Sequence, residues 1–180
     1  MNNTVDELRR DCIKKQKRGL HFIIASVFIW AVILLIHLSS LPLENKNLYT
    51  FCCSAPLMPL AFAISKIIKV DFQNKENPFT NLGIIFSVAQ IPYLLIAMWA
   101  FAEVPEKMVM LYSIIFGAHL LPYGWFYRSK VYYVLSMLIP ISALITGVNF
   151  SSAVVAALML CIEIMFCICL IIENKISGNI

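Results

Sequence analysis

The sequence predicts an all-α membrane protein, a bundle of six transmembrane helices with both termini in the cytoplasm. The chain of 180 residues is 61% hydrophobic and only 13% charged, whereas about 25% of the residues of a soluble domain are charged. The charges also cluster in short segments between long uncharged runs, which is typical of a chain that crosses a bilayer several times. A soluble fold of this size could not bury so much apolar side chain, so we expect lipid as the solvent.

The uncharged runs predict where the helices lie. Four runs without Lys, Arg, Asp or Glu cover 19–43, 47–65, 77–102 and 108–127, each near or above the roughly 20 residues that cross the hydrocarbon core. In a fifth run, 131–172, the only charged residue is Glu163. This run would form a helix of about 63 Å, too long for one crossing, and its GVNFSS segment favours a turn. We expect spans over 20–41, 48–68, 79–102, 108–127, 131–148 and 151–172, between a basic leader (1–19) and a short tail (173–180).

The distribution of basic residues predicts the orientation. With six crossings, all but Lys46 and Lys107 of the 14 Lys and Arg residues fall on the side of the termini. The positive-inside rule therefore places both termini in the cytoplasm. The leader segment VDELRRDCIKKQKR has two interpretations. It is a basic amphipathic helix that binds anionic lipid at about 1 kcal/mol per cation, or only a topology signal, which we prefer.

Three long polar side chains are expected at one depth in the membrane. Glu163 lies about 18 Å along its helix from the turn at Ser151, close to the midplane. His119 and Gln90 reach a similar depth on two other spans. Tyr112 and Tyr123 fall on the same side of their span as His119. Because polar residues avoid lipid, these five residues are candidates for a substrate or proton path through the bundle.

Two roles remain open for Glu163. Burial in a low dielectric favours the neutral form of a carboxyl group, whereas a nearby protonated histidine favours the carboxylate. A Glu–His pair could therefore exchange a proton, as a proton-coupled transporter requires. Alternatively, Glu163 only joins helices through hydrogen bonds to Gln90 or His119. For His119 and Gln90 taken alone, the structural role is favoured.

Prolines interrupt several predicted spans. Pro56, Pro59, Pro92 and Pro140 lie within spans two, three and five, where they remove backbone hydrogen bonds. Such positions are hinge candidates, although kinks without a function in motion are the commoner outcome.

The sequence predicts no enzyme, metal site or cofactor. It contains no HExxH, GxSxG or phosphate-binding loop motif. Residues of types that bind metals are expected near the outer surface: His37, Glu44, Cys52, Cys53, Glu103 and Glu106. Their spacing matches no recognised metal site, so we interpret the charged ones as ordinary solvated loop residues. Nothing indicates nucleic-acid binding.

The segments FCCSAPLMPLAFAISKIIKVDF, NPFTNLGIIFS and VPEKMVMLYSIIFGAHLLPYGWFY are distinctive. Through them the chain resembles an uncharacterised family of small bacterial membrane proteins of about this length. The resemblance covers nearly the whole chain. It implies a six-helix fold and a location in the bacterial cytoplasmic membrane. It implies no reaction, substrate or site residue.

The leading functional hypothesis is a small-solute or proton-linked transporter built around Glu163, His119 and Gln90. The alternative is a non-transporting accessory, sensor or immunity-type protein that acts through another membrane protein. Six short helices enclose little volume, so we expect a homodimer or a membrane-protein partner in addition to the lipid bilayer. A water-accessible cavity at Glu163 would favour transport, and a dry centre would favour the alternative.

Overall fold

The apolar runs of the chain form helices, because backbone groups in lipid have no water to bond and must bond within their own segment. The computed structural model describes residues 2–71, 74 and 76–178, and this part of the chain contains helices and no strand. The elements are α1 (Asn2–Gln16), η1 (Lys17–Gly19), α2 (Leu20–Leu38), α3 (Leu43–Ser54), α4 (Leu57–Ile67), α5 (Pro78–Val88), η2 (Ile91–Tyr93), α6 (Leu94–Glu103), η3 (Pro105–Lys107), α7 (Met108–His119), α8 (Leu121–Phe126), α9 (Lys130–Asn149) and α10 (Ser152–Ile176). The predicted all-α class is confirmed.

The helices overlap the ranges expected for the spans, and one of these ranges is bent sharply. In the described part of the chain, five segments are long and apolar enough to cross a membrane: Thr4–Leu38, Pro78–Glu103, Pro105–Phe126, Lys130–Asn149 and Ser152–Ile176. The sixth candidate is the pair α3 and α4, which is bent by 43° at its break. The chain is therefore compatible with a membrane protein of five or six crossings, and the count of six stays a prediction.

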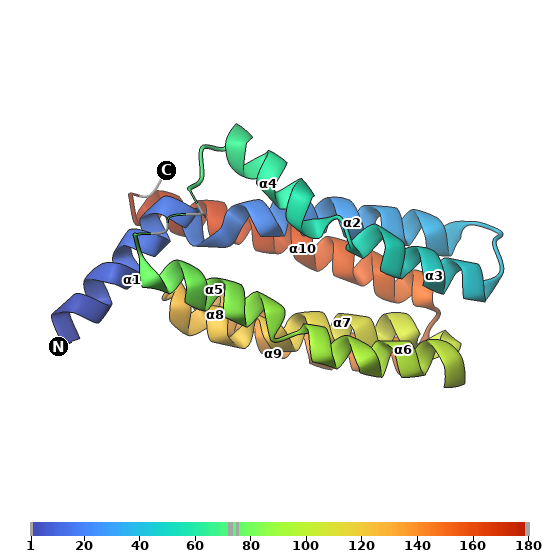
Figure 1. Cartoon of the computed structure of the whole chain (residues 1–180). Helices are drawn as coiled ribbons and strands as arrows, with labels where there is room; N and C mark the ends of the chain where they lie inside the picture. Colours follow the sequence, from blue (N-terminus) through green and yellow to red (C-terminus); the bar gives the residue numbers. More distant parts are fainter. Residues whose placement is uncertain (1, 72–73, 75, 179–180) are drawn as a thin grey trace.

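Two antiparallel helix pairs form the centre of the bundle. The helices α2 and α10 pack along their length, and α7 packs against α9. The helices α3 and α4 lie against α2, while α5 and α6 lie against α8 and α7 (Figure 1). Both termini lie at one end of the bundle, which we call the terminal end (Figure 1). Lys75, a cation assigned to this end, and residues 179–180 of the predicted tail lie outside the described residues.

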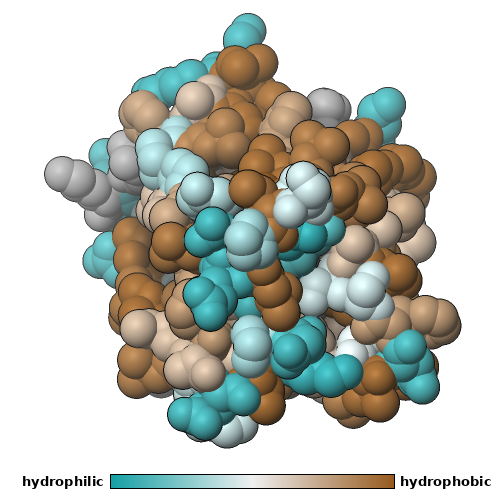
Figure 2. Space-filling model, turned by 90° about the vertical axis from the view of Figure 1, so that its right-hand side faces the viewer, coloured by the Kyte–Doolittle hydropathy of each residue, from teal (hydrophilic) through white to brown (hydrophobic). Residues whose placement is uncertain are grey.

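The opposite end carries the turns at 39–42, 104–107 and 150–151. Figure 2 shows this end with hydrophilic residues gathered in the middle and hydrophobic residues on the flanks. Large apolar side chains are exposed along nearly every helix of the bundle. A soluble protein rarely exposes so much contiguous apolar surface, so the surface supports a lipid environment. The compartment that each end faces stays a prediction.

The hinge candidates lie at different kinds of position. Pro56 directly precedes α4 at the 43° bend, and Pro59 lies in the first turn of α4, where no helical hydrogen bond is lost. Pro92 lies in the short helix η2 that separates α5 from α6. Pro140 lies inside α9, which continues through it. Pro56 and Pro92 therefore mark breaks, and motion at any of the four stays a prediction.

Glycines allow α7 and α9 to approach closely. A Cβ at Gly117 of α7 would lie 2.6 Å from the Ile139 Cγ2 and 2.6 Å from the Pro140 Cδ. A Cβ at Gly147 of α9 would lie 2.5 Å from the Met110 Cβ. Small residues bring membrane helices together in this way because lipid supplies no hydrophobic drive between them.

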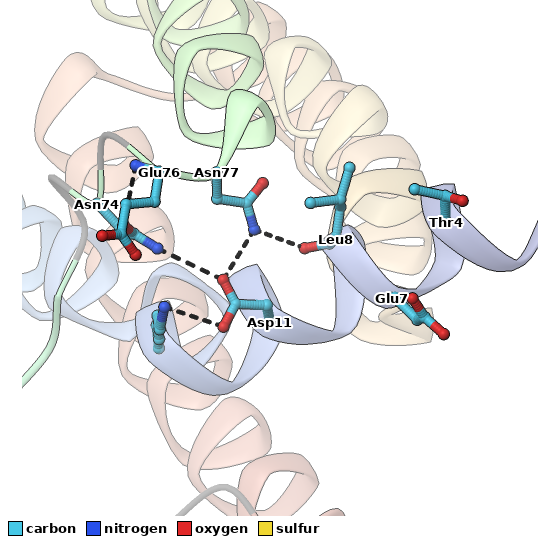
Figure 3. A pocket seen from close by; sticks show the side chains of 8 residues that line it. Thr4, Glu7, Leu8, Asp11, Asn74, Glu76 and Asn77 are labelled. Carbon is cyan, nitrogen blue, oxygen red and sulfur yellow. Dashed lines mark hydrogen bonds and ion pairs between the residues drawn. The ribbon is translucent and has the colours of Figure 1, made fainter.

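The basic leader forms α1, which is held by residues far along the chain. The Nδ2 of Asn77 donates to the Leu8 carbonyl (2.9 Å) and to the Asp11 Oδ2 (2.8 Å), while the Lys15 Nζ lies 3.0 Å from the Asp11 Oδ1. Figure 3 shows Asp11 at the meeting point of these contacts, beside a surface pocket. The leader therefore docks on the bundle as well as carrying charge.

We predict that alanine at either close glycine weakens the bundle. Gly117→Ala and Gly147→Ala should each lower stability by roughly 1–3 kcal/mol through overpacking, seen as a lower apparent melting temperature in detergent. The control is Gly83→Ala in α5, where the added Cβ would lie 3.4 Å from the Phe126 Cζ. It should be neutral or stabilising, because alanine favours helix. Equal melting temperatures for all three variants would contradict the close packing of α7 on α9.

We also predict that docking of α1 weakens in acid. Burial opposes ionisation of Asp11, but hydrogen bonds from Asn77 and Lys15 outweigh it and hold the pKa of its carboxyl below the ordinary value of 3.8. A pKa that is lower in the folded state stabilises the fold above that ordinary value, and the contribution is lost as the pH falls through the lowered pKa. Asp11→Asn should therefore flatten the fall in melting temperature between pH 6 and about pH 3. Glu7→Gln, an exposed carboxyl on the same helix, is the control, and identical profiles for the Asp11 variant and the wild type would refute the assignment.

Candidate functional site

Glu163 lies at the centre of the α2–α10 contact. Its side chain is fully buried, at 0% exposure, on the face of α10 that packs against α2. The Ser26 hydroxyl of α2 lies near the carboxyl group, but neither carboxyl oxygen has a hydrogen-bond partner of standard geometry in the described structure. A buried polar group without a hydrogen bond is unfavourable by about 1–3 kcal/mol, and buried polar groups are normally paired. Glu163 is therefore an exception in need of an explanation.

The space around Glu163 is filled by side chains. Trp30 and Ile33 of α2 and Met159 and Phe166 of α10 are each at most 1% exposed. They belong to one continuous apolar core. Surface pockets lie beside α1 (Figure 3) and at the α5–η2 junction, and Glu163 lines neither. The carboxyl group thus lies in a packed, buried centre.

The structure does not link His119 or Gln90 to Glu163. His119 is the last residue of α7, where its Nδ1 lies 2.5 Å from the Phe116 carbonyl oxygen. Gln90 is half-buried between α5 and η2. Among the described residues, no hydrogen bond or ion pair joins the three. His119 is at the end of α7, and Gln90 lies in the turn between α5 and η2, so neither lies on α2, the helix that packs along α10.

The two tyrosine candidates join helices. The Tyr123 hydroxyl donates to the Gly83 carbonyl (2.9 Å) and shares a hydrogen bond with the Ser87 hydroxyl (2.6 Å), which ties α8 to α5. The Tyr123 ring also lies 6.0 Å from that of His119. Tyr112 of α7 lies 5.9 Å from Trp30 and 6.3 Å from Phe51, centroid to centroid. Both residues therefore have structural partners, and their predicted part in a path stays a prediction.

Sequence reasoning missed a buried polar network at the terminal end. Arg18 is only 6% exposed. Its guanidinium donates to the Asn174 Oδ1 (2.8 Å) and the Ser177 Oγ (2.9 Å) and lies 3.6 Å from the Glu173 carboxylate. These four residues, Arg18, Glu173, Asn174 and Ser177, are the terminal-end network. Further hydrogen bonds extend it: Asn174 donates to the Lys17 carbonyl (3.0 Å), Tyr132 donates to the Arg18 carbonyl (2.8 Å), and Ser129 donates to the Glu173 carboxylate (2.6 Å).

A backbone feature makes this network possible. Lys17, Arg18 and Gly19 all have positive φ, at 45°, 52° and 73°. This left-handed turn separates α1 from α2 and directs Arg18 inward, and its conformation suits glycine far better than lysine or arginine. The only sequence signal for it was Gly19 at the start of the apolar run.

A second set of polar contacts joins helices and turns at the opposite end of the bundle. The His37 Nε2 lies 3.1 Å from the Thr50 Oγ1, and the Asn47 Nδ2 donates to the Pro105 carbonyl (2.8 Å). The Lys107 Nζ donates to the Gly147 carbonyl (2.7 Å) at the end of α9. Within the described residues, no group of three or more His, Cys, Asp and Glu side chains could hold a metal ion.

We predict opposite effects for substitutions of the two buried polar residues of α10. Glu163→Met should raise stability by about 1–3 kcal/mol, because it removes an unpaired polar group at nearly constant volume. Asn174→Leu should lower it by about 1.5–3 kcal/mol, because it removes the Asn174 Oδ1 that accepts a hydrogen bond from the buried Arg18 guanidinium. Both are measured as apparent melting temperatures in detergent. Destabilisation by Glu163→Met equal to that by Asn174→Leu would show that Glu163 has a partner.

Comparison with known proteins assigns the chain to a protein family. A search of curated proteins found no match, and a search of solved structures found none either. A scan of protein families matches residues 5–173. That range includes α2, most of α10 and Glu163. The chain belongs to the "Family of unknown function (DUF7010)".

Proposed function

We propose that this protein is a non-transporting membrane protein, an accessory or sensor that acts through another membrane protein. The packed centre is the observation that carries this proposal. A transporter needs a hydrated or solute-sized space at its midplane site. Here Glu163 is 0% exposed and surrounded by fully buried Met159, Phe166 and Ile33.

The ends of the bundle support the same function. The terminal-end network joins η1 to α10 through buried hydrogen bonds. At the opposite end, Asn47 and Lys107 join the turns to neighbouring helices. Opening a path to Glu163 from either side would first have to break one of these sets of contacts.

The segment α5–η2–α6 is a candidate surface for a partner. Only 11% of its most apolar window is buried, against 33–50% in the other four long spans. Its exposed residues include Tyr93, Met98 and Trp99, each at least 56% exposed. Aromatic residues and methionine are enriched in protein interfaces. A helix so weakly held by its own bundle is suited to bind a second membrane protein.

A proton-linked transporter is the second candidate, and the unpaired carboxyl of Glu163 favours it. Ionisable residues inside membranes are expensive and are typically functional. In this case α2 and α10 would separate during the transport cycle and expose Glu163 to water on one side at a time.

We predict that the protein supports no proton flux of its own. Purified wild type and Glu163→Gln are reconstituted in liposomes with a pH-sensitive dye inside, and a potassium gradient with valinomycin drives proton entry. Both should match protein-free liposomes, and a protonophore added last confirms that the dye responds. Flux in the wild type that Glu163→Gln abolishes would overturn the proposal in favour of transport.

The partner surface has its own test. A photo-crosslinking amino acid replaces Trp99 in cells of the source organism, and the same amino acid at lipid-exposed Met137 of α9 is the control. Position 99 should give a crosslinked membrane protein and position 137 none. Crosslinks to lipid alone at both positions would contradict the role of α6.

A further inference from the structure

Several cations of the leader, which the sequence offered as ligands for anionic lipid, contact other parts of the protein in the structure. The Arg9 guanidinium lies over the Trp125 ring, 4.2 Å from its centroid, and donates to the Trp125 carbonyl. Lys15 pairs with Asp11, and Arg18 is buried with Glu173. Much of the positive charge of the leader therefore serves contacts within the protein.

A group of three lysines beside α4 has no carboxylate partner among the described residues. The Lys17 Nζ donates to the Ile68 carbonyl at 2.9 Å, which brings the leader to the end of α4. Lys66 and Lys69 lie on either side of that carbonyl in sequence, and both are exposed. None of these three lysines forms an ion pair with a carboxylate in the part of the chain that the structure describes. Asp71, the acid that follows them, is exposed, and its backbone N–H bonds the Lys15 carbonyl.

Apolar surface adjoins these cations. The terminal end of α4 diverges from the bundle (Figure 1). Along it Met58, Phe62 and Ile67 are 49%, 40% and 78% exposed. The Lys66 Nζ lies over the Phe62 ring, 4.9 Å from its centroid. Lys66 and Lys69 therefore lie next to an exposed apolar face of α4.

We propose that Lys17, Lys66 and Lys69 form a binding site for the headgroup of an anionic phospholipid, whose acyl chains lie along Met58 and Phe62 of α4. Each ammonium group has several donors for phosphate oxygens. All three cations would attract the negative charge of the phosphodiester, and the apolar face of α4 would contact the chains. This site is separate from Glu163 and does not depend on the proposed accessory function.

The test compares two double variants that remove the same charge from the same end. Lys66→Gln/Lys69→Asn alters the proposed site, and asparagine is used at position 69 because it tolerates the φ of 55° there. Lys130→Gln/Lys175→Gln removes two exposed lysines elsewhere at the terminal end. Native mass spectrometry in detergent measures binding of phosphatidylglycerol and of phosphatidylcholine with the same acyl chains.

We expect the wild type to bind phosphatidylglycerol more tightly than phosphatidylcholine. Lys66→Gln/Lys69→Asn should weaken phosphatidylglycerol binding about tenfold or more, since each cation near the surface contributes appreciably, while the control variant stays within about twofold of wild type. Equal weakening by both variants would show attraction to the whole end only and would overturn the site, as would no weakening by either. Matching size-exclusion profiles and melting temperatures establish that both variants fold, and Lys66→Gln alone provides a milder variant with the same expected direction.

Discussion

The antiparallel contact of α2 with α10 is the constraint on which the rest of the structure depends. Lipid offers no hydrogen bonds, so polar groups in this contact must find partners within the protein or remain unpaired. At the terminal end they are paired, because Arg18 reaches Asn174 and Ser177 across the contact. At the middle of the contact, the carboxyl oxygens of Glu163 have no hydrogen-bond partner of standard geometry in the described structure. The remaining helices pack around this contact, with α4 on one side and the α7–α9 pair on the other.

The helix positions could be predicted from the sequence because charge spacing reports membrane thickness. The choice of helix neighbours could not. In a soluble helix one apolar stripe identifies the buried face, but in lipid both faces are apolar. Spacing along the chain suggests a depth for Glu163 and His119, but it does not give the direction of either side chain around its helix axis. The grouping of these two residues with Gln90 rested on depth alone, and the described structure shows no contact among them.

Arg18 shows a second limit of the sequence. A cation in a basic leader is normally solvated and contributes to topology, which is how the leader was interpreted. The left-handed conformation at Lys17 and Arg18 instead buries this side chain. Non-glycine residues adopt it only where surrounding contacts compensate, and those contacts come from Asn174 and Ser177, more than 150 residues away. Apart from Gly19, no local pattern could have indicated it.

Exclusion of water from Glu163 is what separates the accessory function from transport most directly. A water-soluble carbodiimide with an amine nucleophile labels carboxyl groups that water reaches, and mass spectrometry locates each label in the native protein. We expect labelling of exposed Glu103 and Glu106 and none of Glu163 until the protein is denatured. Labelling of Glu163 in the folded protein to the extent seen at Glu103 would contradict a dry centre and favour a transport path.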